Sequence, residues 1–135
     1  MIRVLVADDH QLFRQGLNAL LRGIQDIHII GEARDGQEAT ELAQQLQPDV
    51  ILMDLEMPRM SGFMATEQLT ALGHPARILV LSMRTDEKAV RAAAQSGAIG
   101  YLVKNCSRDE LVSGIRAAYA GNPASSPEIA SFFSK

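Results

Sequence analysis

Three aspartates stand directly behind two apolar runs of the sequence. Asp8 and Asp9 follow the run 2–7, and Asp54 follows the run 50–53. Such runs are typical of strands buried on both faces, and the carboxyl ends of parallel strands form the edge of an α/β sheet where ligands bind. We therefore expect the three carboxylates to converge. Like charges that close favour a cation between them, and Mg²⁺ (or Mn²⁺) suits because it takes oxygen ligands and keeps several waters.

Two further apolar runs end on groups that bind phosphate. The run 78–81 stops at Ser82, and the run 101–103 stops at Lys104. A cation, an ammonium and a hydroxyl together suit the equatorial oxygens of a phosphoryl group in transfer. A carboxylate can itself attack phosphorus, and Asp54 is the natural nucleophile because Asp8 and Asp9 share one strand and can serve the metal. No general base for hydrolysis is evident, so the acyl phosphate should persist as a signal.

Each of these residues also has a plainer interpretation. Asp9 precedes a helix and is a possible cap, Ser82 is a possible helix cap or turn residue, and Lys104 is a possible solvated lysine. His10 lies beside the acids, but a hard Mg²⁺ site prefers oxygen, so we interpret it as a helix-start residue. Cys106, near a lysine, is either a thiol of lowered pKa or, as we favour, an ordinary structural cysteine.

Strand-like and helix-like segments alternate five times along the chain. This alternation predicts an α/β fold: a doubly wound, five-stranded parallel sheet of order 2-1-3-4-5 flanked by five helices, as in flavodoxin-like folds. The strands are expected at 2–7, 27–33, 49–53, 77–82 and 99–103.

Helix boundaries carry their own signals. Ser107 with Glu110 predicts a capping box, Pro48 a helix stop, and Gly97 a left-handed helix end. The first helix is expected to bury a stripe of Leu12, Phe13, Leu17, Leu20 and Leu21, and the third a weaker stripe of Ala65, Leu69 and Leu72.

Composition excludes several classes of protein. The 135 residues suit one domain, and a net charge of −3 without a basic block argues against nucleic-acid binding by this chain alone. Cys106 is the only cysteine, so no internal disulfide is possible and a reduced, cytoplasmic setting fits best. No apolar run approaches the roughly 18 residues of a membrane span, and we expect no membrane partner.

Taken together, four motifs resemble the receiver domain of bacterial two-component response regulators, the CheY-like fold. The resemblance covers residues 1 to about 120. The motifs are Val6-Ala7-Asp8-Asp9-His10, Met53-Asp54-Leu55-Glu56-Met57-Pro58 with Gly62, Leu81-Ser82-Met83, and Gly100-Tyr101-Leu102-Val103-Lys104.

This resemblance implies a phosphoacceptor signalling domain and not an enzyme, although such a domain takes part in its own phosphorylation and slow dephosphorylation. Asp54 is implied to accept phosphate from the phosphohistidine of a sensor histidine kinase. The implied metal ligands are Asp8, Asp9, Asp54 and the backbone carbonyl of Glu56.

Further roles follow from the same resemblance. Lys104 and Ser82 are implied to contact the phosphoryl group. Ser82 and Tyr101 are implied to be the switch pair, in which the hydroxyl moves toward phosphate and the ring turns inward. Pro58 and Gly62 correspond to residues that shape the loop after the phosphoacceptor.

Finer details resemble the NarL/FixJ (LuxR-type) branch. These include the Ser-Pro-Glu-Ile-Ala tail, and members of that branch continue into a helix-turn-helix domain through which DNA is bound. We expect a receiver over 1–120 and, over 121–135, a linker and the start of a helix toward an effector domain outside this chain. Within that helix Ser126 is the expected cap, and Phe132 and Phe133 either pack back or face something missing. The branch also implies a homodimer on phosphorylation, with the first and last helices as candidate faces.

Several alternatives remain open. A stand-alone receiver would act by protein–protein contact. A phosphohydrolase of the haloacid-dehalogenase kind is disfavoured because the chain has no cap insertion, although Glu56 stands two residues after Asp54. A flavodoxin-like mononucleotide binder would need a phosphate-binding loop after the first strand, where Asp8 and Asp9 would repel phosphate. A degenerate receiver that is not phosphorylated is disfavoured because the acids, the hydroxyl and the lysine are all present. Asn105, where many receivers have proline, and Met83, bulkier than usual, depart from the family pattern.

Overall fold

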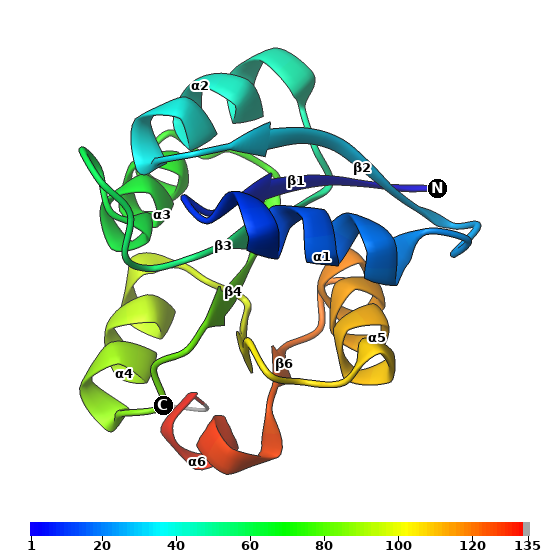
Figure 1. Cartoon of the computed structure of the whole chain (residues 1–135). Helices are drawn as coiled ribbons and strands as arrows, with labels where there is room; N and C mark the ends of the chain where they lie inside the picture. Colours follow the sequence, from blue (N-terminus) through cyan, green and yellow to red (C-terminus); the bar gives the residue numbers. More distant parts are fainter. Residues whose placement is uncertain (134–135) are drawn as a thin grey trace.

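One parallel sheet runs through the molecule, with helices on both of its faces (Figure 1). The computed structural model describes residues 1–133. The sheet order β2-β1-β3-β4-β5-β6 confirms the predicted order of five strands and adds a sixth at the β5 edge. The strands are β1 (Ile2–Ala7), β2 (Ile27–Ala33), β3 (Val50–Met53), β4 (Arg77–Ser82), β5 (Gly100–Val103) and β6 (Ala124–Ser125).

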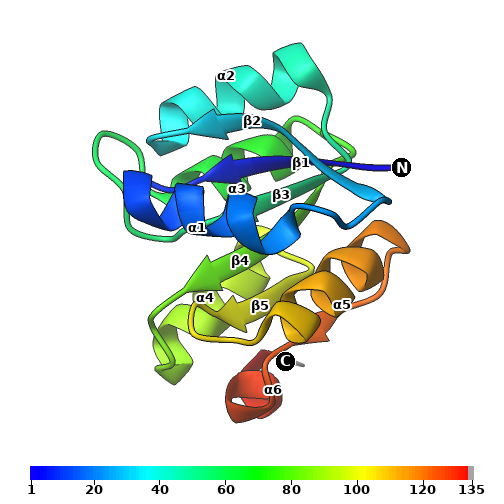
Figure 2. The same ribbon diagram turned by 45° about the vertical axis from the view of Figure 1, so that its right-hand side comes forward.

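Helices α1 and α5 cover one face of the sheet, and α2, α3 and α4 cover the other (Figures 1 and 2). The five helices confirm the alternation expected from the sequence, and a short sixth helix follows them. Their bounds are α1 (Gln11–Leu21), α2 (Gly36–Leu46), α3 (Gly62–Ala71), α4 (Glu87–Ser96), α5 (Arg108–Tyr119), the 3-10 turn η1 (Pro127–Ile129) and α6 (Ala130–Phe133).

The core lies in two layers because successive strand residues point to opposite faces. In β1, Val4 and Val6 pack under α1 and α5, whereas Leu5 and Ala7 pack under α2 and α3. All four are buried. A strand covered on both sides has no polar face, which explains why β1 and β3 stand out in the sequence as apolar runs, interrupted only by Arg3 near the start of β1.

Two of the expected apolar stripes are partly wrong. In α1 the side chains of Leu12 and Leu20 are 82% and 39% exposed, and the buried face is instead made by Arg14, Leu17 and Leu21. Positions 12 and 14 differ by about 200° around a helix, so one of them must face away from the sheet. Leu72 is also exposed, because it lies at the end of α3 and not within it.

The predicted helix boundaries are largely confirmed. Ser107 and Glu110 form the expected capping box, in which each side chain accepts a hydrogen bond from the other residue's backbone N–H. Gly97 ends α4 with φ of +115°, a left-handed conformation that glycine adopts without strain. α2 ends just before Pro48, with Gln47 as its C-cap.

The segment after α5 packs against the domain. β6 pairs with β5, and Ile129 and Phe133 are buried in the same core layer as residues of α4. The expected helix is a 3-10 turn followed by α6, and Ser126 makes no side-chain cap bond, since its hydroxyl bonds β5 instead. Phe133 therefore packs back, as does the partly buried Phe132. The domain boundary at 120 stays a prediction, and the last two residues of the range 121–135 lie outside the described residues.

Candidate functional site

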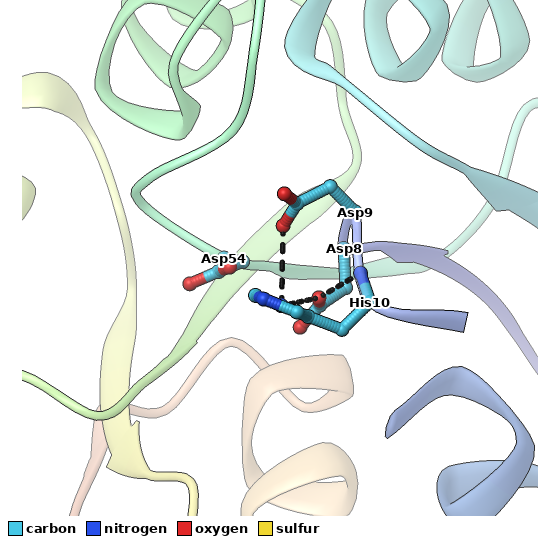
Figure 3. A group of neighbouring side chains, drawn as sticks. All are labelled: Asp8, Asp9, His10 and Asp54. Atoms are coloured by element: carbon cyan, nitrogen blue, oxygen red, sulfur yellow. Dashed lines mark hydrogen bonds and ion pairs between the residues drawn. The ribbon is translucent and has the colours of Figure 1, made fainter. Parts of the chain in front are cut away.

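The ends of β1 and β3 bring the acidic side chains together. Ala7 and Met53 are paired in the sheet, so Asp8 and Asp54 follow directly from neighbouring positions. Both carboxylates are buried, with exposed fractions of 2% and 7%. One ligand atom from each of Asp8, Asp9, His10 and Asp54 lies within 4.8 Å of the others (Figure 3). The structure thus brings together the three aspartates that the strand ends predicted.

Lys104 completes this cluster from β5. Its Nζ lies 2.6 Å from Asp8 Oδ2 and 3.4 Å from Asp54 Oδ2, and its side chain is 9% exposed. The backbone fixes this position, since the Lys104 N–H donates to the Ser82 carbonyl at 2.9 Å. The ammonium also lies 4.4 Å from the ring centroid of Phe13, a cation–π contact that the sequence did not indicate. The interpretation of Lys104 as a solvated lysine is therefore wrong.

Electrostatics leave Asp54 short of compensating charge. Burial raises the pKa of Asp54, and the like charge of Asp8 adds to this, whereas Lys104 and the hydrogen bond from the Leu55 N–H act in the opposite direction. A single ammonium faces two buried carboxylates, and a third carboxylate, Asp9, lies at the surface beside them. This cluster has a deficit of positive charge that a divalent cation would correct.

The donor set fits a hard cation. Asp8 Oδ2 is buried and accepts no hydrogen bond among the described residues, because the nearby Lys104 ammonium approaches outside hydrogen-bonding geometry. A buried carboxylate oxygen without a hydrogen bond is costly unless a charge faces it. Together with oxygen atoms of Asp9 and Asp54, it offers the ligand type that Mg²⁺ prefers.

His10 begins α1, as interpreted from the sequence. It occupies the N-cap position without a side-chain cap bond, and its backbone N–H donates to Asp8 Oδ1 at 2.8 Å. Its Nδ1 lies 3.1 Å from Asp8 Oδ1 and 3.2 Å from Asp9 Oδ1 (Figure 3). Because His10 and not Asp9 is the N-cap, the capping interpretation of Asp9 is wrong.

Ser82 ends β4 in a turn. Its Oγ accepts a hydrogen bond from the Arg84 N–H at 3.1 Å, so the turn interpretation is confirmed, while the N-cap of α4 is Asp86. Tyr101 lies on β5 with no exposed surface, and its hydroxyl donates to the Arg84 carbonyl at 2.8 Å. Burial raises the pKa of Tyr101. The Tyr101 ring thus points inward in this structure. Ser82 and Tyr101 both bond to the backbone of Arg84, the first to its N–H and the second to its carbonyl.

Arg84 is a residue that the sequence reasoning missed. Its guanidinium donates to both carboxylate oxygens of Asp86, at 3.0 and 2.9 Å, and lies 3.3 Å from Glu56 Oε2. The Glu56 side chain therefore turns to the surface and toward the β4–α4 loop. The role of the Glu56 carbonyl as a metal ligand stays a prediction.

The loop after Asp54 has a tightly set path. A Cβ at Gly62 would overlap the Asp54 carbonyl, and the Gly62 N–H donates to the Leu55 carbonyl at 2.8 Å. The Pro58 carbonyl accepts from the Met60 N–H at 2.7 Å. Glycine is thus required at position 62 for close backbone approach, in line with the loop role that the resemblance implied for it. The role implied for Pro58 stays a prediction.

An ion pair anchors the same loop from outside. Asp35, which is 1% exposed and caps α2, accepts a hydrogen bond from Arg59 Nε at 2.9 Å. That contact holds Arg59 at a φ of +66°. Both the Glu38 N–H and Arg59 lower the pKa of Asp35. The partners stand 24 residues apart, so no local pattern could have indicated them.

Arg14 supports the site from beneath. It is a buried arginine whose Nη1 donates to the Asp8 carbonyl at 2.5 Å and whose Nε bonds Glu32 Oε1 at 2.9 Å. A usable signal existed, because positions 14, 17 and 21 share one helix face and an arginine there needs buried partners.

The peptide bond after Lys104 and the thiol of Cys106 answer two questions that the sequence left open. The Lys104–Asn105 peptide bond is trans. Burial raises the pKa of the Cys106 thiol, so the hypothesis of a lowered pKa is wrong and the structural interpretation is favoured. Among residues 1–133, no helix combines the length and apolarity needed to cross a membrane.

The doubly wound sheet with a cluster of aspartates at its carboxyl edge has the features that the sequence motifs share with receiver domains, and sequence comparison agrees. The family model of the response regulator receiver domain matches residues 4–116. The chain is 44% identical to the transcriptional regulatory protein LiaR of Bacillus subtilis, covering 96% of this chain and 62% of that protein. It is 37% identical to the response regulator GacA of Pseudomonas aeruginosa, over 96% and 61% of the two chains.

The fold is also similar to solved structures of response regulators. The receiver domain of the putative response regulator NarL from Mycobacterium tuberculosis has a TM-score of 0.86 and 36% identity, over 90% of this chain and 98% of that one. A LuxR-family response regulator from Aurantimonas has a TM-score of 0.91 and 32% identity, over 99% and 96%. This chain belongs to the response regulator receiver domain family, in its NarL/FixJ (LuxR-type) branch. It spans about three fifths of the length of LiaR and GacA.

Proposed function

We propose that the chain accepts a phosphoryl group on Asp54 from a sensor histidine kinase and thereby controls an output. The observation that carries this proposal is the environment of Asp54: a buried carboxylate at the sheet edge, 3.4 Å from the Lys104 ammonium and beside two further aspartates. Family membership supports it, because the matched family is that of response regulator receivers.

In the proposed reaction an Asp54 oxygen attacks phosphorus, the O–P bond forms, and the N–P bond to the donor imidazole breaks. Lys104 neutralises charge on an equatorial oxygen, and the Ser82 hydroxyl, whose oxygen accepts from the Arg84 N–H, donates its own proton to another. Burial helps, since it makes the Asp54 carboxylate poorly solvated and each fixed charge more effective. Asp8, Asp9, Asp54 and the Glu56 carbonyl would hold Mg²⁺, which supplies charge neutralisation when bound.

We propose that the output is transcription. LiaR and GacA are a transcriptional regulatory protein and a response regulator, each longer than this chain. We propose that the chain acts in the cytoplasm, that DNA is bound only through a further helix-turn-helix domain, and that phosphorylation promotes a homodimer through α1 and α5. The exposed Leu12 and Leu20 on α1 support that face. A stand-alone receiver is the alternative.

Incubation of the chain with acetyl phosphate and Mg²⁺, followed by intact mass measurement, tests the phosphoacceptor. We expect one added phosphoryl group, lost with EDTA and absent in Asp54→Asn. Asp109→Asn, an exposed aspartate in the first turn of α5, is the matched control and should label normally.

Two outcomes would contradict the proposal. Labelling that persists in Asp54→Asn would place the acceptor elsewhere. Steady turnover of many phosphate monoesters would support the phosphohydrolase instead.

A further inference from the structure

A single serine from the tail of the chain holds the strand that carries the switch and the phosphate-binding lysine. The Ser126 Oγ accepts a hydrogen bond from the Val103 N–H at 2.9 Å, and the Ser126 N–H donates to the Tyr101 carbonyl at 3.0 Å. Ser126 is 3% exposed, so both bonds are shielded from water. It thus binds β5 on both sides of Leu102, immediately before Lys104.

The residues around Ser126 form a layer over β5 and α4, which we call the clasp segment (Ala124–Phe133). β6 extends the sheet beside β5, and α6 lies against α4. Ile129 is completely buried and Phe133 nearly so, in the core layer that includes Tyr101 and Val103. In Figure 1 the clasp segment is orange and red: β6 runs downward to the right of α4, and α6 lies at the bottom of the view. Its buried apolar side chains therefore pack in the same core layer as side chains of β5, the strand that ends beside the acidic cluster.

A chain of contacts connects the acidic cluster around Asp54 to the clasp segment. The Lys104 ammonium lies between Asp8 and Asp54. A phosphoryl group on Asp54 would therefore change the electrostatic interactions of Lys104, the residue that directly follows β5. Val103, the neighbouring residue, donates the bond that Ser126 accepts. Hydrogen bonds weaken when their geometry is distorted. A shift of the end of β5 would therefore change the strength of the bond between Val103 and Ser126 and, with it, the stability of the clasp segment.

We propose that Ser126 is a positioning residue for β5, through which the clasp segment and the phosphorylation site at Asp54 influence each other. The inference rests on the proposed phosphoacceptor function of Asp54. Coupling between two sites is reciprocal. Phosphorylation must therefore change the stability of the clasp segment, and loss of the Ser126 hydroxyl must change the affinity of the site for a phosphoryl group.

The first test is amide hydrogen exchange on the full chain, in Mg²⁺ alone and in Mg²⁺ with beryllium trifluoride as the phosphoryl mimic. We expect exchange of the Ser126 and Ile129 amides to change at least several-fold when the mimic binds. This measurement needs no variant. Protection around Asp54 with unchanged exchange across the clasp segment would overturn the inference and leave the phosphoacceptor function standing. No response anywhere in the chain would refute the phosphoacceptor function and the inference with it.

The second test is the affinity for the mimic in matched variants. Ser126→Ala removes the acceptor and should shift the half-saturating beryllium trifluoride concentration at least three-fold, while Ser126→Thr, which keeps an oxygen, restores it. Ser125→Ala, half-buried on β6, is the control and should bind as the wild type does. A purely structural role predicts instead that Ser126→Ala lowers the melting temperature without moving this concentration, a result that would contradict the proposal.

Discussion

Asp54 carries an unfavourable charge in the metal-free protein. Its pKa is raised mainly by burial and further by Asp8. A carboxyl whose pKa is raised in the folded protein stabilises the fold at pH values below its ordinary pKa, which is near 3.8. This contribution is lost as the pH rises through the raised pKa of the folded state. At neutral pH the ionised carboxylate therefore opposes folding.

Asp54→Asn should consequently be more stable than the wild type at pH 7 in EDTA, by on the order of 1 kcal/mol, because a neutral amide replaces a buried charge. The difference should shrink as pH falls toward 4, because the wild-type carboxyl then becomes neutral too. Thermal unfolding at several pH values measures it. Glu67→Gln, an exposed change of the same charge, should show no such pH dependence. A variant less stable than the wild type at pH 7 would contradict this account of Asp54.

In the proposed reaction Lys104 contacts the phosphoryl group, and we expect it to compete with the cation for Asp8. Its ammonium lies 2.6 Å from Asp8 Oδ2, where a cation ligand is needed. Lys104→Met should therefore bind Mg²⁺ more tightly, by about tenfold, while phosphorylation by acetyl phosphate slows by about 10- to 100-fold because a charge on the transferring group is lost. Calorimetric Mg²⁺ titration and timed mass measurements separate the two effects. Lys88→Met, exposed on α4, should change neither, and weaker Mg²⁺ binding in Lys104→Met would refute the competition.

At the level of elements, two glycines differ in what surrounds them. Gly16 lies within α1, and a Cβ there would meet nothing within 4 Å, whereas a Cβ at Gly62 would overlap the Asp54 carbonyl. Gly16→Ala should stabilise the protein by about 0.5–1 kcal/mol through reduced chain entropy. Gly62→Ala should destabilise it by about 1–3 kcal/mol and weaken Mg²⁺ binding. Denaturant unfolding checks both, and equal effects would contradict the structural assignment.

Strands with long apolar runs were predictable from the sequence, whereas β6, which is defined only by its pairing with β5, was not. The runs ending at Asp8 and Asp54 are apolar because both faces of β1 and β3 are covered, so the strands and their acidic ends could be predicted together. β6 is only Ala124–Ser125 and has no hydrophobic period. What defines it is pairing with β5, more than twenty residues earlier, which leaves no local signal.

The site shows the same division. Carboxylates and Lys104 at strand ends were predictable because strand direction alone places them on one edge. Arg84 was not, since its role depends on the backbone of a turn and on Glu56, 28 residues away. The hydrogen bond from the buried Tyr101 hydroxyl to the Arg84 carbonyl was not predictable either, because Arg84 lies in a turn 17 residues earlier. The role of Tyr101 in switching stays a prediction.

At the scale of the whole molecule, the tail contributes to stability. Ile129 has no exposed surface and packs in the layer beneath α4. Ile129→Ala should therefore cost about 2–4 kcal/mol in the free energy of unfolding, as other large-to-small changes in a core do. Urea unfolding of the full chain measures this cost. Glu128→Ala, exposed on the same turn, should stay within about 0.5 kcal/mol, and similar values for both variants would show that the tail does not complete the core.

The position of β6 also limits how copies of this protein can associate. An outermost strand with free N–H and C=O groups invites a strand from another molecule. Here β6 pairs with Gly100 and Tyr101, and the Ser126 hydroxyl takes the N–H of Val103. The outer side of β5 therefore has few backbone groups left for a foreign strand. The edge that replaces it, β6, is only two residues long, and very short edge strands give a foreign strand little to pair with. Intermolecular continuation of the sheet is thus disfavoured on that flank.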